Sequence, residues 1–413
     1  MIVLATCKRA VAAPGFCRSL SRLQSAASAS APEETNVAAT LFEKERQRQL
    51  ALNPRLRKVV VRTERRRQFP PISNNKYGLV EPHDARVELV MNLDLSTPHD
   101  CVKHLGRYEL QNCALSLVND QLWPLHQPLS LSLPDRLRLL STDYDSDFAS
   151  KTDLQKTTTT AVDRPVGSKL PKDRTDREPK SSIDLDLLYF DQRVDENDDG
   201  DRKLCTVHRA FWNSCSTFLG ACLARSFDER LKPQLFGYPD VPRAYESGSF
   251  VYDFSLDVSD WQPKPTEVQS MCRSGLKHLK EEKRLFEPLL CSTETALEMF
   301  EGNRLKQAIL SRLDERLVTV YRLGRHVDVA QTPLIADTEQ IGRFEITAVY
   351  KLRETRQGAA FYRAQGVALP ASQKVAPLVW RMLCNASARQ KANLPLPDLN
   401  MPWGYNSLDE ECD

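Results

Sequence analysis

The sequence has no long hydrophobic run and lacks the residue patterns that usually build active sites. Its 413 residues hold no apolar stretch of about 18, the length needed to cross a bilayer, so we expect no membrane span. Its 11 cysteines form no C-x-x-C pair, which argues against a structural zinc site or a disulfide framework. Its seven histidines form no H-x-x-x-H pair, and no phosphate-binding loop or nucleophile elbow is present. The sequence therefore predicts no catalytic residue, metal, cofactor or small-molecule substrate.

One acidic motif invites a test for calcium. Asp195–Gly200 fits the first six positions of an EF-hand loop, but the twelfth position holds Thr206 where a bidentate glutamate is required. The eighth position, usually apolar, is Arg202. We therefore interpret the segment as a solvated acidic turn and expect no calcium site.

Acidic residues are absent from the start of the chain, before Glu33. Residues 1–31 are basic and rich in serine and alanine, the composition of a mitochondrial transit peptide. The alternative is a start that is merely disordered. Targeting by this segment would place the protein in the mitochondrial matrix.

The overall charge is nearly balanced, with 57 basic and 55 acidic residues and a formal net charge of +2. The balance conceals a basic N-terminal arm over 32–83. Between Arg46 and Arg67 the only acidic residue is Glu64, and an excess of arginine suits phosphate binding. The alternative is a solvated, disordered arm. The candidate RNA-binding residues are Arg46, Arg48, Arg55, Arg57, Lys58, Arg62, Arg65, Arg66 and Arg67.

Residues 84–143 predict a small α/β unit of the β-grasp kind. Arg86–Met91 alternates as a strand, Ser96-Thr97-Pro98 opens a helix, and Cys113–Val118 begins a hairpin. Two segments compete to close the sheet, Asp135–Leu140 and 184–190, and the sequence does not decide between them. Residues 144–182 between them are too polar to bury a core, so we expect a flexible insertion there.

A second domain, of α+β class, is expected over 204–384. Apolar residues at three- and four-residue spacing predict a helix from Thr206 to Phe227. Further helices are expected from Thr266, which opens a capping-box pattern, and over 294–300. Residues 385–413 are polar and rich in proline and predict an extended tail. The predicted strands are 249–256, 317–321, 326–329 and 343–349.

Both domains resemble the N-terminal part of threonyl-tRNA synthetase. The first resembles its TGS domain, and the second resembles the editing domain that follows. The matching stretches are Phe211–Thr217, Ser249–Phe254 and Tyr321–Leu334. The aminoacylation and anticodon-binding domains of the synthetase have no counterpart in this sequence.

The resemblance implies a degenerate editing site. The family carries H-x-x-x-H on its first helix and a later C-x-x-x-H, and here those pairs read Asn213 with Thr217 and Ala330 with Leu334. Without imidazole or thiol the site lacks a general base and a soft metal ligand. Lys306 and Asp328 match two other polar positions of the pocket, where we expect structural roles.

The combination of transit peptide, basic arm, TGS-like domain and degenerate editing domain resembles the mitochondrial large-subunit ribosomal protein thirty-nine family. Three stretches fit that family: Asn92–Pro98, Val118–Leu129 and Ala364–Pro370. The resemblance implies a non-catalytic structural protein that contacts mitochondrial large-subunit ribosomal RNA and other mitochondrial ribosomal proteins. The alternatives are a tRNA-binding or regulatory module outside the ribosome and a freestanding editing hydrolase.

Overall fold

The computed structural model describes residues 36–52, 56–64, 86–131, 182–190, 198–227, 231, 233–258, 261–281, 283–354 and 360–405. The expected transit peptide, the candidate strand Asp135–Leu140 and all of the expected insertion except Ser182 lie outside those residues. Within the described part, the chain is α+β, as expected, and is built around three sheets.

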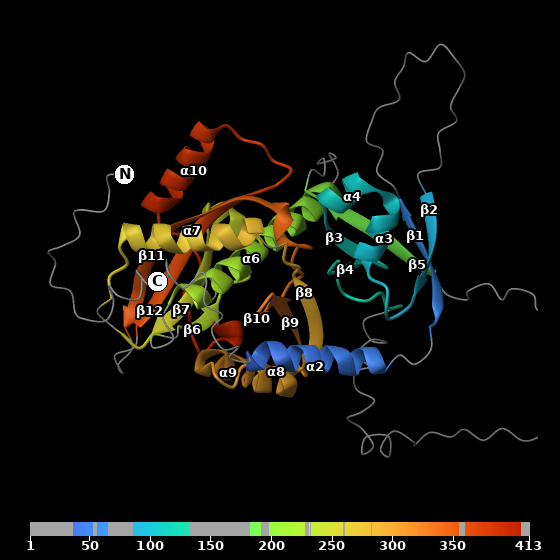
Figure 1. Ribbon diagram of the computed structural model, residues 1–413, viewed down its shortest axis with the longest axis horizontal. Helices are drawn as coiled ribbons and strands as arrows, with labels where there is room; N and C mark the ends of the chain where they lie inside the picture. The colour runs from blue at the N-terminus through green and yellow to red at the C-terminus, as the bar shows by residue number, and fades with distance from the viewer. Residues whose placement is uncertain are drawn as a thin grey trace, which may run out of the picture.

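A five-stranded mixed sheet forms one end of the molecule (Figure 1). Of its neighbouring pairs, β1 and β5 run parallel, and the others run antiparallel. This is the arrangement expected for a β-grasp unit, and residues 184–189 of the predicted segment 184–190 lie within β5. Across the sheet the order is β2 (Arg86–Asn92), β1 (Lys58–Glu64), β5 (Ser182–Tyr189), β3 (Cys113–Val118) and β4 (Gln121–Trp123).

The helix of this unit, α3 (Pro98–Leu105), begins where its sequence predicted. Thr97 caps it, and Asp100 completes a capping box by accepting from the backbone N–H of Thr97 at 3.0 Å. The helix buries Cys101, Val102 and Leu105 against the sheet, and the short α4 (Arg107–Asn112) leads into β3.

Two parts of the expected arm over 32–83 form regular secondary structure. Val37–Ala51 forms helix α2, and Lys58–Glu64 forms β1 near the middle of the sheet. Val59 and Val61 are fully buried, whereas Lys58 and Arg62, on the opposite face of the strand, are exposed. The strand was hidden because its exposed face carries the charges that suggested an arm.

A second sheet, of four strands, occupies the other end of the molecule. Its order is β11 (Ile341–Glu354), β12 (Ala360–Pro370), β7 (Phe250–Leu256) and β6 (Gln234–Gly237), all antiparallel. The predicted strand 249–256 is confirmed with a start one residue later, and the predicted strand 343–349 is the central part of β11, which has 14 residues.

Two long helices cover one face of this sheet, and the C-terminal region covers the other. On the first face, α6 (Asp198–Ser226) and α7 (Pro265–Glu281) enclose the main core with Tyr362 and Ala364 of β12. Alternate residues of the strand point the opposite way, where α10 (Pro377–Arg389) and the segment after it lie. Figure 1 shows α10 and α7 as separate layers. The tail over 385–413 is therefore helical as far as Arg389.

A three-stranded sheet completes the second domain, in the order β10 (His326–Val329), β9 (Leu317–Leu323) and β8 (Glu287–Ser292). It packs on α8 (Thr293–Met299), α9 (Arg304–Leu310) and α2, around the fully buried Phe42.

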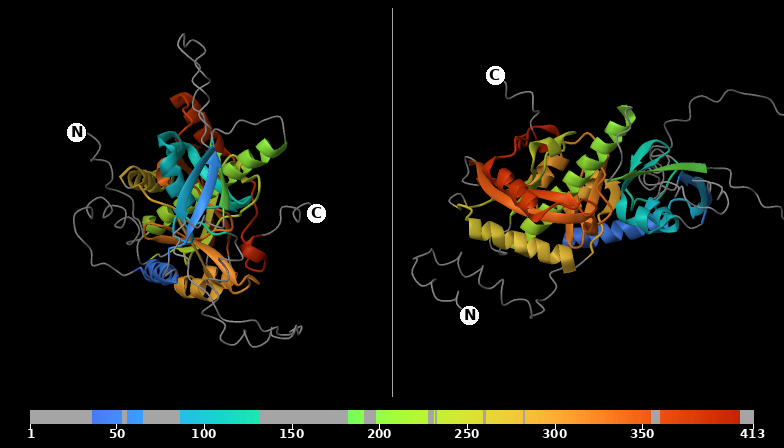
Figure 2. Two further views of the ribbon diagram at one scale, coloured as in Figure 1. Left: turned by 90° about the vertical axis from the view of Figure 1, so that its right-hand side faces the viewer. Right: turned by 90° about the horizontal axis from the view of Figure 1, so that it is seen from above.

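Helix α2 therefore belongs to this layer, and β1, only a few residues later, belongs to the first sheet. Figures 1 and 2 show α2 running beside the small sheet toward the β-grasp unit.

The two units share buried contacts. Leu115 and Leu188 of the first sheet join the core formed around α6. The Gln340 side chain donates to the Cys113 carbonyl at 2.6 Å, and His126 lies 3.1 Å from the Ala336 carbonyl. Among the described helices, none combines the length and the apolar character that a membrane crossing requires.

Candidate functional site

The positions that match the editing pocket lie together between α6, α9 and the end of β10. Asn213 and Thr217 are one turn apart on α6, so they share a face of the helix. The Asn213 amide donates to Asp240 at 2.7 Å and to Thr332 at 2.9 Å. The Thr217 hydroxyl bonds to the carbonyl of Asn213 at 3.1 Å. These hydrogen bonds tie both side chains to the protein itself.

The other two replaced positions are apolar and buried. Ala330 follows β10 with 4% of its surface exposed, and Leu334 is 1% exposed in the loop beyond it. Neither side chain can ligate a metal or transfer a proton. Within the described residues, no group of three histidine, cysteine or acidic side chains is placed to hold a metal ion. The EF-hand-like motif runs into helix α6 at Asp198, so residues 198–206 cannot form the loop that calcium needs.

Lys306 and Asp328 form a buried ion pair beside these positions. Asp328 also accepts from the Tyr252 hydroxyl at 2.7 Å and from the backbone N–H of Val329 at 2.8 Å. Burial opposes ionisation of Asp328, but the Lys306 ammonium, helped by His326, outweighs it and holds the pKa of Asp328 well below its usual range. The carboxylate of Asp328 is therefore fully engaged by partners within the protein, and its low pKa makes it a poor general base.

The tyrosines beside the pair are also unsuited to proton transfer. Tyr238 and Tyr252 are buried, and burial raises the pKa of each phenol well above its ordinary value. The hydroxyl of Tyr252 is committed to Asp328, and that of Tyr238 lies 3.3 Å from Thr217. This cluster stabilises the fold and offers no activated nucleophile or base.

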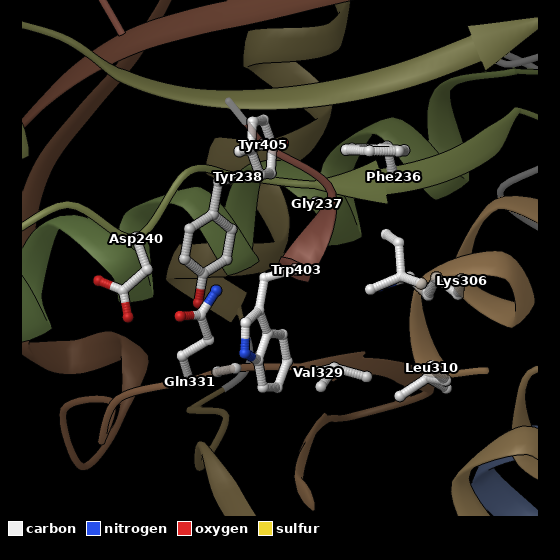
Figure 3. Close-up of a pocket in the computed structure, with 12 residues that line it drawn as sticks. Phe236, Gly237, Tyr238, Asp240, Lys306, Leu310, Val329, Gln331, Trp403 and Tyr405 are labelled. Carbon is white, nitrogen blue, oxygen red and sulfur yellow. The ribbon is translucent and has the colours of Figure 1, made fainter. Parts of the chain in front are cut away.

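A small cavity remains where a substrate would have to enter. Its volume of about 40 Å³ holds roughly three water molecules, far less than a nucleoside needs. Figure 3 shows Trp403 standing between Gln331 and Val329 in the middle of this space. The lining residues are Phe236, Gly237, Tyr238, Asp240, Lys306, Ile309, Leu310, Val329, Ala330, Gln331, Trp403 and Tyr405.

The C-terminal segment fills the rest of the cleft. Trp403 packs on the core of the three-stranded sheet, and the ring of Tyr405 meets Phe236 edge-on at 5.2 Å. A Cβ on Gly404, whose φ is +78°, would come within 2.6 Å of Phe236, so the close approach requires glycine. We call residues 392–405 the C-terminal strap.

Arg363 and Asp253 anchor the strap. Both side chains are buried and form a two-pronged ion pair with N–O distances of 2.8 Å. Arg363 also donates to the carbonyls of Leu394 and Pro395, and the Tyr405 hydroxyl donates to Asp253 at 3.0 Å. The prediction of an extended tail missed these anchors, although Trp403-Gly404-Tyr405 is an unusual sequence for a loose end.

The candidate RNA-binding residues are divided between two elements. Arg46 and Arg48 lie on α2, where they pair with Glu287 and Glu45. Arg57, Lys58 and Arg62 lie in or just before β1 and bond to Asp94, Asn92 and Glu88 respectively. Of the five candidates that the structure describes, these last three lie on one segment and the other two lie on α2. The remaining candidates, Arg55, Arg65, Arg66 and Arg67, lie outside the described residues.

Comparison with known proteins gives a consistent set of relatives, although no protein-family model matches the chain. The large ribosomal subunit protein mL39 of Drosophila melanogaster is 29% identical over 314 residues, which cover 75% of this chain and 76% of that protein. Cytoplasmic threonine–tRNA ligase 2 of Xenopus tropicalis is 27% identical over 48% of this chain, and ligase 1 of Rattus norvegicus is 28% identical over 41%. The match spans 22% and 21% of those two enzymes. These similarities confirm the predicted resemblance to the mitochondrial large-subunit ribosomal protein thirty-nine family and, more distantly, to threonyl-tRNA synthetases.

Proposed function

We propose that this protein is a non-catalytic structural component of the large subunit of the mitochondrial ribosome. The observation that carries the proposal is the similarity to mL39, which extends over 75% of the chain. The filled cleft supports it, because a protein that keeps the fold without the chemistry fits a structural role better than an editing hydrolase. In this proposal residues 1–31 direct import into the matrix, the β-grasp unit is a TGS domain, and residues 204–384 are a degenerate editing domain.

The proposal includes contact with ribosomal RNA through the start of β1. The side chains of Arg57 and Arg62 are 58% and 57% exposed, and Lys58 is exposed on the same strand face as Arg62. The partner of Arg62, Glu88, is 66% exposed, and exposed ion pairs contribute only about 0–1 kcal/mol each. A phosphate could therefore replace Glu88 at little cost, whereas Asp94, the partner of Arg57, is only 5% exposed.

The neighbouring surface limits what kind of RNA contact is possible. The exposed face of the sheet also carries Glu64, Glu88, Asp184 and Asp186, so it is mixed in sign rather than uniformly basic. We infer a local contact with the phosphate backbone at the edge of this face, without reading of base sequence. Arg65, Arg66 and Arg67 would extend the same contact along the chain.

A sucrose gradient of mitochondrial lysate tests the proposed function. The full-length protein is expected to sediment with the large subunit and to remain there after washing in moderate salt. Migration at the top of the gradient, with none in the large-subunit peak, would refute the ribosomal role and favour a module outside the ribosome.

The RNA contact has its own test. Arg57, Lys58, Arg62, Arg65, Arg66 and Arg67 are replaced by glutamine in the full-length protein. Incorporation into the subunit should be weaker at low salt and should fall less steeply as salt rises, because each lost phosphate contact removes a counterion-release contribution and the salt dependence that comes with it. The matched control replaces six exposed cations elsewhere: Arg107, Arg243, Lys264, Arg304, Arg312 and Arg316. Equal incorporation of the two variants at every salt concentration would contradict the RNA contact.

A further inference from the structure

Helix α10 attaches to the protein by a narrow stripe. Ser387 is buried, and its hydroxyl lies 2.6 Å from those of Ser249 and Thr347. Trp380 and Cys384 are half-buried on the same side, and the Arg343 guanidinium lies 5.6 Å from the Trp380 ring. Almost the whole remaining surface of the helix faces solvent.

The outer face of α10 is apolar. Leu378, Val379, Met382 and Leu383 are 61%, 44%, 62% and 40% exposed. They account for four of the ten large exposed hydrophobic side chains among the described residues, and they fall within six consecutive positions. Leu378 with Met382 and Val379 with Leu383 are spaced four residues apart, so the side chains form one continuous surface, which we call the α10 ridge. Apolar patches of this kind on a protein surface usually mark an interaction site.

The charged residues of the segment that carries the ridge all have one sign. Residues 371–391 include Lys374, Arg381, Arg389 and Lys391 and no aspartate or glutamate. Arg381 and Arg389 belong to α10 itself, and both are exposed. A partner that covers the ridge must therefore offer an apolar centre and accept positive charge at its border.

The pattern favours a protein over RNA or a lipid surface. Phosphates would meet the cations but leave the four aliphatic side chains without a complementary surface. Helices that lie on membranes bury leucine, tryptophan or phenylalanine in the interface. The ridge presents leucine, but the aromatic residue of α10, Trp380, turns toward the sheet and Arg343. Four aliphatic anchors at helical spacing match the way in which an amphipathic helix docks into a groove.

We propose that the α10 ridge docks into an apolar groove, rimmed by carboxylates, on a neighbouring protein. This inference rests on the proposed ribosomal function for the place where the neighbour is found. Leu378 and Met382, the most exposed of the four, insert into the groove, and Arg381 and Arg389 pair with its rim. Truncating such central anchors usually weakens a complex at least tenfold.

The experiment uses the full-length protein in assembled subunits. A photo-crosslinking amino acid at position 379, another exposed position of the ridge, is expected to join one protein, at a site where apolar residues are flanked by aspartate or glutamate. Leu378→Asp together with Met382→Asp should abolish that crosslink and weaken retention in the subunit at least tenfold. Arg381→Glu together with Arg389→Glu should weaken it less, and the loss should shrink as salt rises.

A control variant tests whether the effect is specific to the ridge, and three results would overturn the proposal. Val37→Asp together with Leu396→Asp, at two other exposed apolar positions, should leave the crosslink and retention unchanged. Crosslinking to RNA, or no crosslink in subunits that contain the protein, would overturn the proposed groove. So would flotation with vesicles of equimolar phosphatidylcholine and phosphatidylserine that depends on Leu378 and Met382. Absence of the wild-type protein from the subunit would refute the proposed function and, with it, this partner.

Discussion

The Arg363–Asp253 pair allows the sharpest prediction, because it joins the sheet to the C-terminal strap. Arg363 is 1% exposed and Asp253 is fully buried. Replacing Arg363 by methionine removes both prongs of the ion pair and the donors to two strap carbonyls. The hydrophobic side chain is of similar length, so loss of packing is small and loss of charge dominates.

The expected loss of stability follows from the buried groups that lose a partner in Arg363→Met. A buried carboxylate that loses its cation destabilises a protein by about 3–5 kcal/mol, and each carbonyl left without a donor costs roughly 1 kcal/mol or more. Set against a typical total stability of about 5–15 kcal/mol, Arg363→Met should remove a third or more of the free energy of unfolding. Removing both charges, with Arg363→Met and Asp253→Leu, should be much milder, because no unpaired charge remains.

Urea denaturation gives the free energies, and limited proteolysis reports on the strap. In Arg363→Met the strap should be cleaved under conditions that spare the wild type. Arg304→Met serves as the control, because Arg304 and Asp257 form an exposed pair 3.8 Å apart that should contribute less than about 1 kcal/mol. If Arg363→Met unfolds at the wild-type urea concentration and its strap stays protected, the pair does not anchor this segment.

Three other predictions concern the filled cleft, the unit interface and the insertion. Lys306→Met should destabilise the protein by about 3–5 kcal/mol, because it removes the cation that pairs with Asp328. The wild type should not deacylate seryl-tRNA. Deacylation that depends on Lys306 or Asp328 would contradict the structural role of this pair. Burial lowers the pKa of His126 to about 4, as it does for His99. Below pH 6.5 the unfolded state therefore binds more protons than the folded state. The free energy of unfolding should fall as pH drops from 6.5 to 4. For His126 this loss is at most about 3 kcal/mol, and unfolding measured across that range should be flatter in His126→Gln. Deletion of residues 144–181 should leave soluble, folded protein, as judged by thermal unfolding, because their composition cannot support a core.

Local patterns predicted much of the fold. The Thr97 cap and the three buried residues of α3 follow from side-chain chemistry within one or two turns, and they are confirmed. The helix expected over 294–300 ends one residue earlier, at Met299. Thr266 lies inside α7 rather than before it, since Glu267 accepts from the backbone N–H of Lys264 and so fixes an earlier start.

Features that depend on distant pairing could not be predicted in this way. The alternation in Lys58–Glu64 was masked by its charges, and only the partners on both sides show that it is a strand. The replaced pocket residues were visible in the sequence, but what fills the pocket was not. Trp403 reaches it from about seventy residues beyond Ala330, held by a buried arginine in another strand.

The position of β1 has a consequence for how the chain folds. Its neighbour β2 follows within about thirty residues, but Val60 pairs with Ser182 of β5, about 120 residues later in the chain. Until β5 arrives, the hairpin of β1 and β2 presents an open edge, and contacts that span so much sequence form slowly. Residues Leu188 and Phe190 of this late segment pack directly on α6. The segment that completes the first sheet therefore also contributes to the core of the second unit, and a chain interrupted before residue 182 would be prone to aggregate through the open edge of β1.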